Sequence, residues 1–281
     1  MTPEIGPNVS VVPFTLEGFE MSPFTSSTGR KRNVYRMGTG PAVIVIHEIP
    51  GITPLVAAFG RKIADRGMTA VLPELFGTAG RPMTISYALT SFARVCVSKE
   101  FTLLALNKTS PIVNYLRELA GHEREVHGGP GVGVVGMCLT GGFALAMSVD
   151  PTVVAPALSQ PSLPLPTNAL RRRSLGLSDD DYNKVRRRAA DNLCVMGLRF
   201  SGDSKSPGDR FVRLREDLGE NFIGVEIDSS PSNPWGYPKN AHSVLTEHYS
   251  DVEGSPTRVA LEDLLNFFTS RLGVTPAANG S

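Results

Sequence analysis

Short apolar runs recur along the chain, and segments with apolar residues at helical spacing separate them. The runs are rich in β-branched and small side chains, which is typical of strands that are buried on both faces. They cover residues 42–46, 69–72, 132–135, 153–158, 193–200 and 222–227. Before them, residues 8–37 alternate weakly between apolar and polar positions and contain turn residues, which predicts an antiparallel hairpin.

Helical spacing predicts that helices connect these strands. Leu55, Phe59 and Ile63 mark one such helix, and Gly67 follows it as an expected C-cap. The expected helices lie at 55–66, within 84–120 (clearest at 112–119), at 209–218 and at 258–272. Strands that alternate with helices indicate an α/β protein with a mainly parallel central sheet and helices on both faces. We expect residues 1–281 to form a single domain.

Residues 159–192 interrupt this alternation. Prolines come early in the segment, and Ser178, followed by Asp179–Asp181 and later by arginines, predicts a capped helix. A helical excursion between two strands is either a lid over a site or an insertion without a role in it, and the sequence leaves both readings open.

The composition of the chain indicates which kinds of partner to expect. Apolar residues make up 41% of the 281 residues and the net charge is +1, which fits a globular protein with a sizeable core and gives no sign of a nucleic-acid or membrane partner. Arg171–Arg173 is a local exception, which we interpret as the solvated face of a helix. Without a signal peptide or a long apolar run, the sequence predicts a cytoplasmic protein, either a monomer or a homodimer.

A glycine-rich turn around Cys138 is the most informative motif. The apolar run at 132–135 leads through Gly136 to Cys138, and Gly141 precedes a stretch of small, helix-compatible residues. A nucleophile elbow needs this strand–turn–helix sequence, with small neighbours so that a strained turn can close. At a helix N-terminus the thiolate is favoured over the thiol. Thr140 stands where the usual motif has a second glycine.

The alternative reading of Cys138 is a small buried residue in a turn. Cys96 and Cys194 lie in apolar surroundings that fit this reading better. Three cysteines at wide spacing form neither a disulfide framework nor a zinc site. We therefore interpret Cys138 as a nucleophile rather than as a metal ligand or half of a disulfide.

A cysteine nucleophile needs a base and a group that orients the base. In α/β-hydrolase order both follow the nucleophile, and the histidine comes last. His242 lies in a polar loop after a strand, whereas its rival His248 fits an exposed helical position. Asp203 follows the strand at 193–200 directly, and its rival Asp209 more naturally opens a helix. Asp203 as a mere turn residue remains an alternative.

The loop after the strand at 42–46 adds accessory candidates. Glu48 stands at the carboxyl end of that strand, which is the ligand-binding edge of an open α/β sheet. Oxyanion donors in such a fold are the N–H of the residue after the nucleophile, here Leu139, and one from this early loop. Ile49 is the candidate, because Pro50 has no N–H. We interpret His47 as a bystander rather than a supporting group.

Five motifs together resemble the dienelactone hydrolases, which are cysteine-dependent α/β hydrolases. They lie at His47–Gly51, Pro73–Gly77, Gly136–Ala144, Gly202–Pro207 and Ala241–Ser243, in the family's order. The resemblance covers roughly residues 40 to 272. It implies an α/β-hydrolase fold and hydrolysis of cyclic enol-lactones and related esters without metal or organic cofactor.

The resemblance also implies roles for single residues. Cys138 is then the nucleophile, His242 the base and Asp203 its orienting acid. Glu48 is implied to pair with the cysteine sulfur and to keep the resting thiol inactive until substrate displaces it.

The departures from the family concern the substrate. Family members that bind dienelactone hold its carboxylate with two arginines. One expected position is slightly displaced here, at Arg81, and the other is occupied by Thr246. Threonine cannot replace the bidentate fork of an arginine, so Arg81, or an arginine of the 171–173 cluster, is the remaining candidate for holding a substrate carboxylate.

These observations predict a hydrolase that cleaves a small-molecule ester or lactone through an acyl-cysteine. A thioesterase or general carboxylesterase is the alternative within catalysis. A non-catalytic binding protein or redox sensor, in which Cys138 is an oxidisable thiol, is the alternative from another class.

Overall fold

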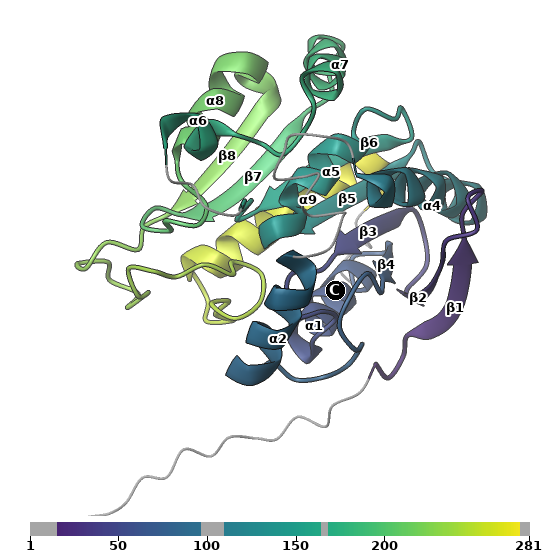
Figure 1. The fold of residues 1–281 in the computed structure, drawn as a ribbon, viewed down its shortest axis with the longest axis horizontal. Coiled ribbons are helices and arrows are strands. Elements are labelled where there is room, and N and C mark those ends of the chain that lie inside the picture. Colours follow the sequence, from purple (N-terminus) through teal and green to yellow (C-terminus); the bar gives the residue numbers. More distant parts are fainter. Residues whose placement is uncertain (1–15, 97–109, 164–167, 276–281) are drawn as a thin grey trace, which may run out of the picture.

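A computed structural model describes residues 16–96, 110–163 and 168–275 of the chain. Its centre is an eight-stranded sheet in the order β1-β2-β4-β3-β5-β6-β7-β8 (Figure 1). The strands are Glu20–Thr25 (β1), Lys31–Met37 (β2), Ala42–Ile46 (β3), Thr69–Pro73 (β4), Val132–Met137 (β5), Val153–Ser159 (β6), Val195–Phe200 (β7) and Phe222–Ile227 (β8). Strand β2 runs antiparallel to both β1 and β4, and all other pairs are parallel. This is the α/β-hydrolase fold.

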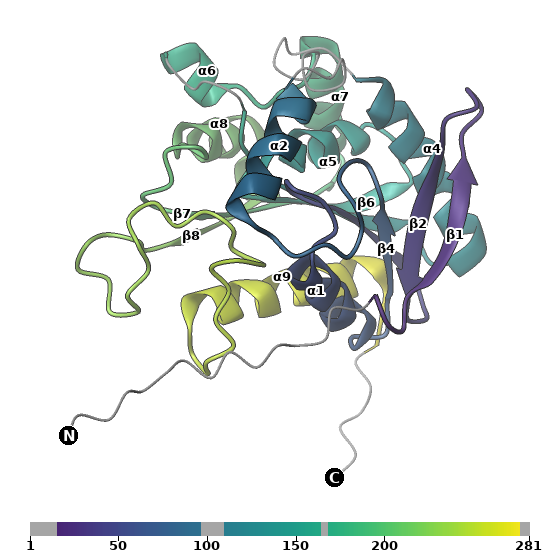
Figure 2. The same cartoon turned by 60° about the horizontal axis from the view of Figure 1, so that its bottom comes forward.

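Helices cover both faces of the sheet (Figure 2). They are Pro54–Ala64 (α1), Ile85–Cys96 (α2), Pro111–His127 (α4), Gly141–Met147 (α5), Ala169–Arg173 (α6), Asp179–Ala190 (α7), Asp209–Leu218 (α8) and Pro256–Leu272 (α9). Apolar side chains of α1 and α9 pack into one core, and those of α4, α5, α7 and α8 pack into a second core on the opposite face. Within the described ranges, no helix combines the length and the apolar character that a membrane span requires.

Most elements lie where the hydrophobic pattern predicts them. Strands β3 and β8 and helix α8 have the predicted bounds, and the hairpin is confirmed as β1 and β2, although residues 8–15 lie outside the described part of the chain. The predicted cap at Gly67 is wrong. Helix α1 ends at Ala64 with Asp65 as its C-cap, while Gly67, at φ 73°, closes the turn that follows.

The excursion after β6 contains the predicted capped helix. The Ser178 hydroxyl accepts the Asp181 N–H at 3.2 Å, and α7 begins there. Tyr182, Val185 and Ala189 of α7 are buried in the core shared with α5 and α8. Helix α7 therefore packs on the face of the sheet as the crossover between β6 and β7.

Candidate active site

Cys138 lies at the point where β5 passes into a short 3₁₀ turn and then into α5. Its φ is 58°, a left-handed conformation that is uncommon for a residue with a side chain and costs about 1–3 kcal/mol. Glycines make the turn possible: a Cβ on Gly136 would lie 2.2 Å from the Thr140 carbonyl oxygen, and one on Gly141 would lie 2.8 Å from Cβ of Pro161. The strand–turn–helix geometry of a nucleophile elbow is thus present.

Thr140 has a structural task in this turn. Its hydroxyl accepts the Met137 N–H at 2.8 Å and donates to the Ile46 carbonyl at 2.7 Å, and the side chain is fully buried. The hydroxyl thereby joins the end of β5 to the end of β3. This bond explains how threonine is accommodated where the usual elbow has glycine.

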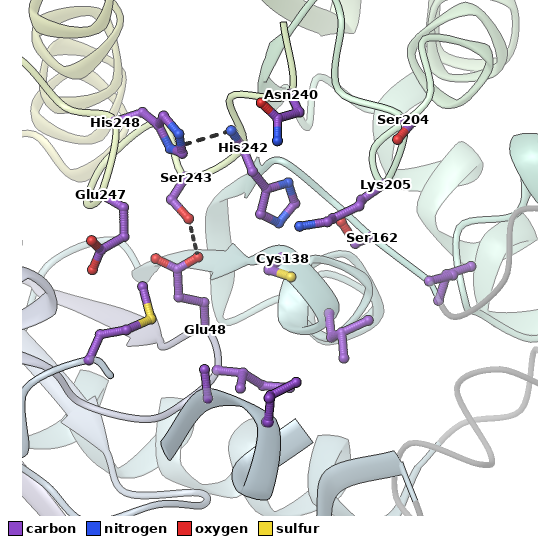
Figure 3. A pocket seen from close by; sticks show the side chains of 16 residues that line it. Glu48, Cys138, Ser162, Ser204, Lys205, Asn240, His242, Ser243, Glu247 and His248 are labelled. Atoms are coloured by element: carbon purple, nitrogen blue, oxygen red, sulfur yellow. Dashed lines mark hydrogen bonds between the residues drawn. The ribbon is translucent and has the colours of Figure 1, made fainter. Parts of the chain in front are cut away.

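His242 and Asp203 form a tight buried pair. Nδ1 of His242 lies 2.6 Å from Oδ2 of Asp203, and both side chains are buried. An N–H at Nδ1 that donates to the carboxylate leaves Nε2 for the sulfur. Figure 3 shows the His242 ring beside the Cys138 sulfur. Nε2 is buried and makes no hydrogen bond of standard geometry within the described residues, although the sulfur is close enough to act on the ring electrostatically.

Opposing effects set the pKa of His242. Burial alone lowers it, but the charge on Cys138 and the interaction with the Asp203 carboxylate raise the pKa well above the usual value for histidine. A protonated His242 imidazole beside the Cys138 sulfur is therefore favoured at neutral pH. This is the resting state that a cysteine nucleophile with a histidine partner needs.

The two rival residues have other environments. His248 accepts the backbone N–H of His242 at 3.4 Å, and burial lowers its pKa. Asp209 opens α8 and forms an ion pair with Arg172 at 2.7 Å. The structure therefore brings His242 and Asp203 together, whereas His248 and Asp209 make other contacts.

The ring of His47, expected to be a bystander, is hydrogen-bonded on both sides to backbone groups. Its Nδ1 lies 3.1 Å from the Glu48 carbonyl, and its Nε2 accepts the Leu75 N–H at 3.2 Å. Burial lowers its pKa to about 4, so the ring is neutral and joins the loops after β3 and β4.

Glu48 is buried and held by neutral donors. Its carboxylate accepts the Ser243 hydroxyl at 2.8 Å, the Gln160 amide at 3.2 Å and the Thr246 hydroxyl. No hydrogen bond between Glu48 and Cys138 occurs in the described part of the chain, in contrast to the pairing that the family resemblance implies. Thr246 therefore fixes Glu48 where family members that bind dienelactone have an arginine.

Replacing Glu48 with glutamine is expected to lower the pH midpoint of Cys138 alkylation without unfolding the protein. Both residues line one cavity, and a carboxylate near the sulfur opposes formation of the thiolate, so removal of its charge favours the thiolate. Iodoacetamide labelling of Cys138 across pH, followed by mass spectrometry, measures the midpoint. Identical profiles for the two proteins would refute this role of Glu48.

A cavity of about 810 Å³ lies over Cys138. Apolar side chains form one wall, including Met83, Ala88 and Leu89 from α2 and the loop before it. Among the described residues, the ionisable side chains that line it are those of Glu48, Lys205, His242, Glu247 and His248. Burial and the nearby Glu48 carboxylate raise the pKa of Glu247.

Other residues predicted to belong to the site can be placed relative to this cavity. Leu139 and Ile49, the predicted oxyanion donors, both line it. Of the segment 159–192, Ser162 and Leu163 line the cavity, and no described residue of α6 or α7 does. The described part of the segment thus contributes to the wall through Ser162 and Leu163.

Three of the arginines predicted as carboxylate clamps, Arg81, Arg172 and Arg173, make contacts outside the cavity. The Arg81 guanidinium stacks 4.1 Å from the ring centre of Tyr87 and is absent from the cavity lining. Arg172 pairs with Asp209, and Arg173 pairs with Glu216. The expectation that Arg81 binds a substrate carboxylate therefore gains no support from this arrangement.

Comparison with known proteins places the chain in a family. The family model described as "Dienelactone hydrolase family" matches residues 29–172, just over half of the chain. The chain belongs to the dienelactone hydrolase family. The matched region contains Glu48 and Cys138, whereas Asp203 and His242 lie beyond it. No curated protein matches this family member by sequence.

Solved structures resemble this dienelactone hydrolase family member at low sequence identity. A putative dienelactone hydrolase from Klebsiella pneumoniae is 19% identical with a TM-score of 0.59, covering 89% of this chain and 98% of its own. A dienelactone hydrolase from Anabaena variabilis is 16% identical with a TM-score of 0.56, covering 91% and 99%. A dienelactone hydrolase-like promiscuous phosphotriesterase from metagenomic libraries is 14% identical with a TM-score of 0.56, covering 91% and 100%. At these identities the likeness concerns the fold.

Proposed function

We propose that this protein hydrolyses an ester or lactone through a Cys138–His242–Asp203 triad and an acyl-cysteine intermediate. The observation that carries the proposal is the strained Cys138 at the elbow, beside a buried His242–Asp203 pair, at one cavity. Backbone strain at a functional residue persists only where the surrounding structure maintains it.

The reaction follows from these positions. The Cys138 thiolate adds to the substrate carbonyl carbon, and the Leu139 and Ile49 N–H groups stabilise the oxyanion. As the carbon–oxygen bond to the leaving group breaks, protonated His242 gives its Nε2 proton to the leaving alkoxide. Neutral His242 then takes a proton from water, which attacks the thioester. The Cys138 thiolate leaves, and protonated His242 is restored.

The nucleophile favours particular acyl groups. A thiolate is soft, so activated esters, enol-lactones and thioesters are better substrates than amides. Turnover of purified protein on a panel of neutral lactones, p-nitrophenyl esters and acyl thioesters tests the proposal and separates a lactonase from a thioesterase or general carboxylesterase. Absence of turnover on every class, together with reversible oxidation of Cys138, would instead favour the redox-sensor alternative.

Dienelactone is expected to be a poorer substrate than a neutral lactone of similar size. Neither candidate position offers an arginine to the substrate carboxylate, because Thr246 binds Glu48 and Arg81 stacks on Tyr87. The described lining of the cavity also contains two carboxylates, Glu48 and Glu247, but one lysine, Lys205. A lost charge-assisted hydrogen bond costs about 1.5–3 kcal/mol, or roughly ten- to a hundredfold in kcat/KM. Measurement of kcat/KM for the two lactones tests this prediction, and a clear preference for dienelactone would contradict it.

A further inference from the structure

Arg210 is the largest fully buried side chain among the described residues and is only 1% exposed. Its guanidinium donates to four backbone carbonyls and makes no ion pair within the described ranges. The acceptors are Ser174 at 2.7 Å, Pro161 at 2.8 Å, Lys205 at 3.0 Å and Arg171 at 3.5 Å. A buried cation that is hydrogen-bonded to carbonyls and forms no ion pair keeps much of its positive field, even with the Asp203 charge nearby.

Two of these carbonyls belong to segments that carry the catalytic site. Pro161 precedes Ser162, whose N–H donates to the Cys138 carbonyl at 2.9 Å. Lys205 follows Asp203 by two residues, and its N–H donates to Oδ1 of Asp203 at 3.0 Å. One Arg210 nitrogen, Nη1, binds both carbonyls. Arg210 therefore connects the segment beside the nucleophile to the loop of the acid.

The charge of Arg210 also acts on the triad. Burial lowers its pKa to about 10, against the opposing influence of the Asp203 and Cys138 charges, so it remains protonated at neutral pH. A fixed positive charge near a thiol stabilises the thiolate.

We propose that Arg210 is a positioning residue of this site, which fixes the Pro161–Ser162 and Asp203–Lys205 segments relative to each other and stabilises the Cys138 thiolate with its positive charge. The expected effect of Arg210 on catalysis rests on the proposed function. The electrostatic consequence is independent of turnover, because it concerns ionisation of Cys138.

Arg199 offers a matched comparison. It is 3% exposed and also holds the acid loop, since its guanidinium donates to the carbonyls of Ser206 at 2.8 Å and Ser201 at 3.0 Å. Unlike Arg210, it forms an ion pair with Glu226. Loss of Arg199 therefore removes loop contacts together with an ion-paired charge. Loss of Arg210 removes loop contacts together with a charge that forms no ion pair within the described residues.

The test measures the pH midpoint of Cys138 alkylation and steady-state kinetics on an activated ester in Arg210→Met, Arg210→Lys and Arg199→Met. Arg210→Met is expected to raise the midpoint by roughly half a pH unit, and Arg199→Met to leave it unchanged. The other ionisable groups around the sulfur are common to all variants: Glu48, Asp203, Lys205, His242, Glu247 and His248. Arg210→Lys keeps the charge but not the planar fork, so its midpoint is retained while kcat falls roughly tenfold with little change in KM.

An unchanged midpoint in Arg210→Met, or an equal shift in Arg199→Met, overturns the electrostatic role. Wild-type kcat in Arg210→Lys overturns the positioning role. If Arg210→Met does not fold, as judged by circular dichroism, Arg210→Lys decides alone, and its wild-type kcat then overturns the proposal. Activity that survives Cys138→Ala contradicts the proposed function instead and leaves the alkylation result standing.

Discussion

Replacing Cys138 with alanine is expected to abolish hydrolysis of every substrate that the protein accepts. The sulfur forms the covalent bond in the proposed reaction, and no other described cysteine lies at the cavity. Loss of a covalent nucleophile typically lowers kcat by about 10³-fold or more, since only oxyanion stabilisation and substrate binding remain. Initial rates on a p-nitrophenyl ester, with folding checked by circular dichroism, measure the loss.

Cys194→Ala is the matched control. Cys194 directly precedes β7, is buried, and its thiol donates to the Asn221 side chain at 3.4 Å. Its substitution removes a sulfur without touching the cavity, so kcat/KM is expected to stay within a few-fold of wild type. Cys96→Ala is likewise expected to leave the chemistry intact, and the Cys96 side chain lies outside the described part of the structure. A Cys138→Ala protein as active as Cys194→Ala would end the nucleophile assignment.

Asp203→Asn is expected to lower kcat by about 10⁴-fold, the scale of the corresponding change in a serine protease triad. Oδ1 of Asp203 accepts the Lys205 N–H, and Oδ2 accepts from Nδ1 of His242. In the variant the amide oxygen keeps the first bond, so the NH₂ group faces Nδ1. His242 is then held with its proton on Nε2 and cannot accept one from the thiol or from water.

Asp209→Asn controls for loss of a carboxylate near the same loop. Asp209 forms a partly exposed ion pair with Arg172, and such pairs contribute little to stability. We expect its kcat to remain within about threefold of wild type by the same assay. Comparable losses in the two variants would contradict the assignment of Asp203.

Local patterns were enough to predict the sheet and the triad candidates. Buried parallel strands are short continuous apolar runs, so 42–46 and 222–227 were predicted with their observed bounds. The elbow is a local feature in which glycines surround Cys138. The predicted base and acid lie on loops after strands, and the fold brings both to the same edge of the sheet.

Contacts between distant loops could not be predicted in this way. The donors around Glu48 come from the end of β6 and from the histidine loop, and nothing in the sequence near Gln160, Ser243 or Thr246 indicates that they converge. Gln160 has φ 37°, a strain that its sequence context does not reveal.

One feature of the sequence around Arg210 is unusual. Arg210 stands in the first turn of α8, where the helix dipole disfavours a cation. A cation in that position indicates an interaction that outweighs the dipole. The carbonyls that provide it come from three separate segments, and only the folded structure reveals them.

The central claim is a covalent acyl group on Cys138. Mixing the protein with an activated ester, quenching with acid within milliseconds to seconds and analysing peptides by mass spectrometry measures it directly, because a thioester survives acid. We predict one acyl group per chain, located on Cys138, formed and lost at rates compatible with turnover. Turnover without an adduct, or an adduct on any other residue, would contradict the account.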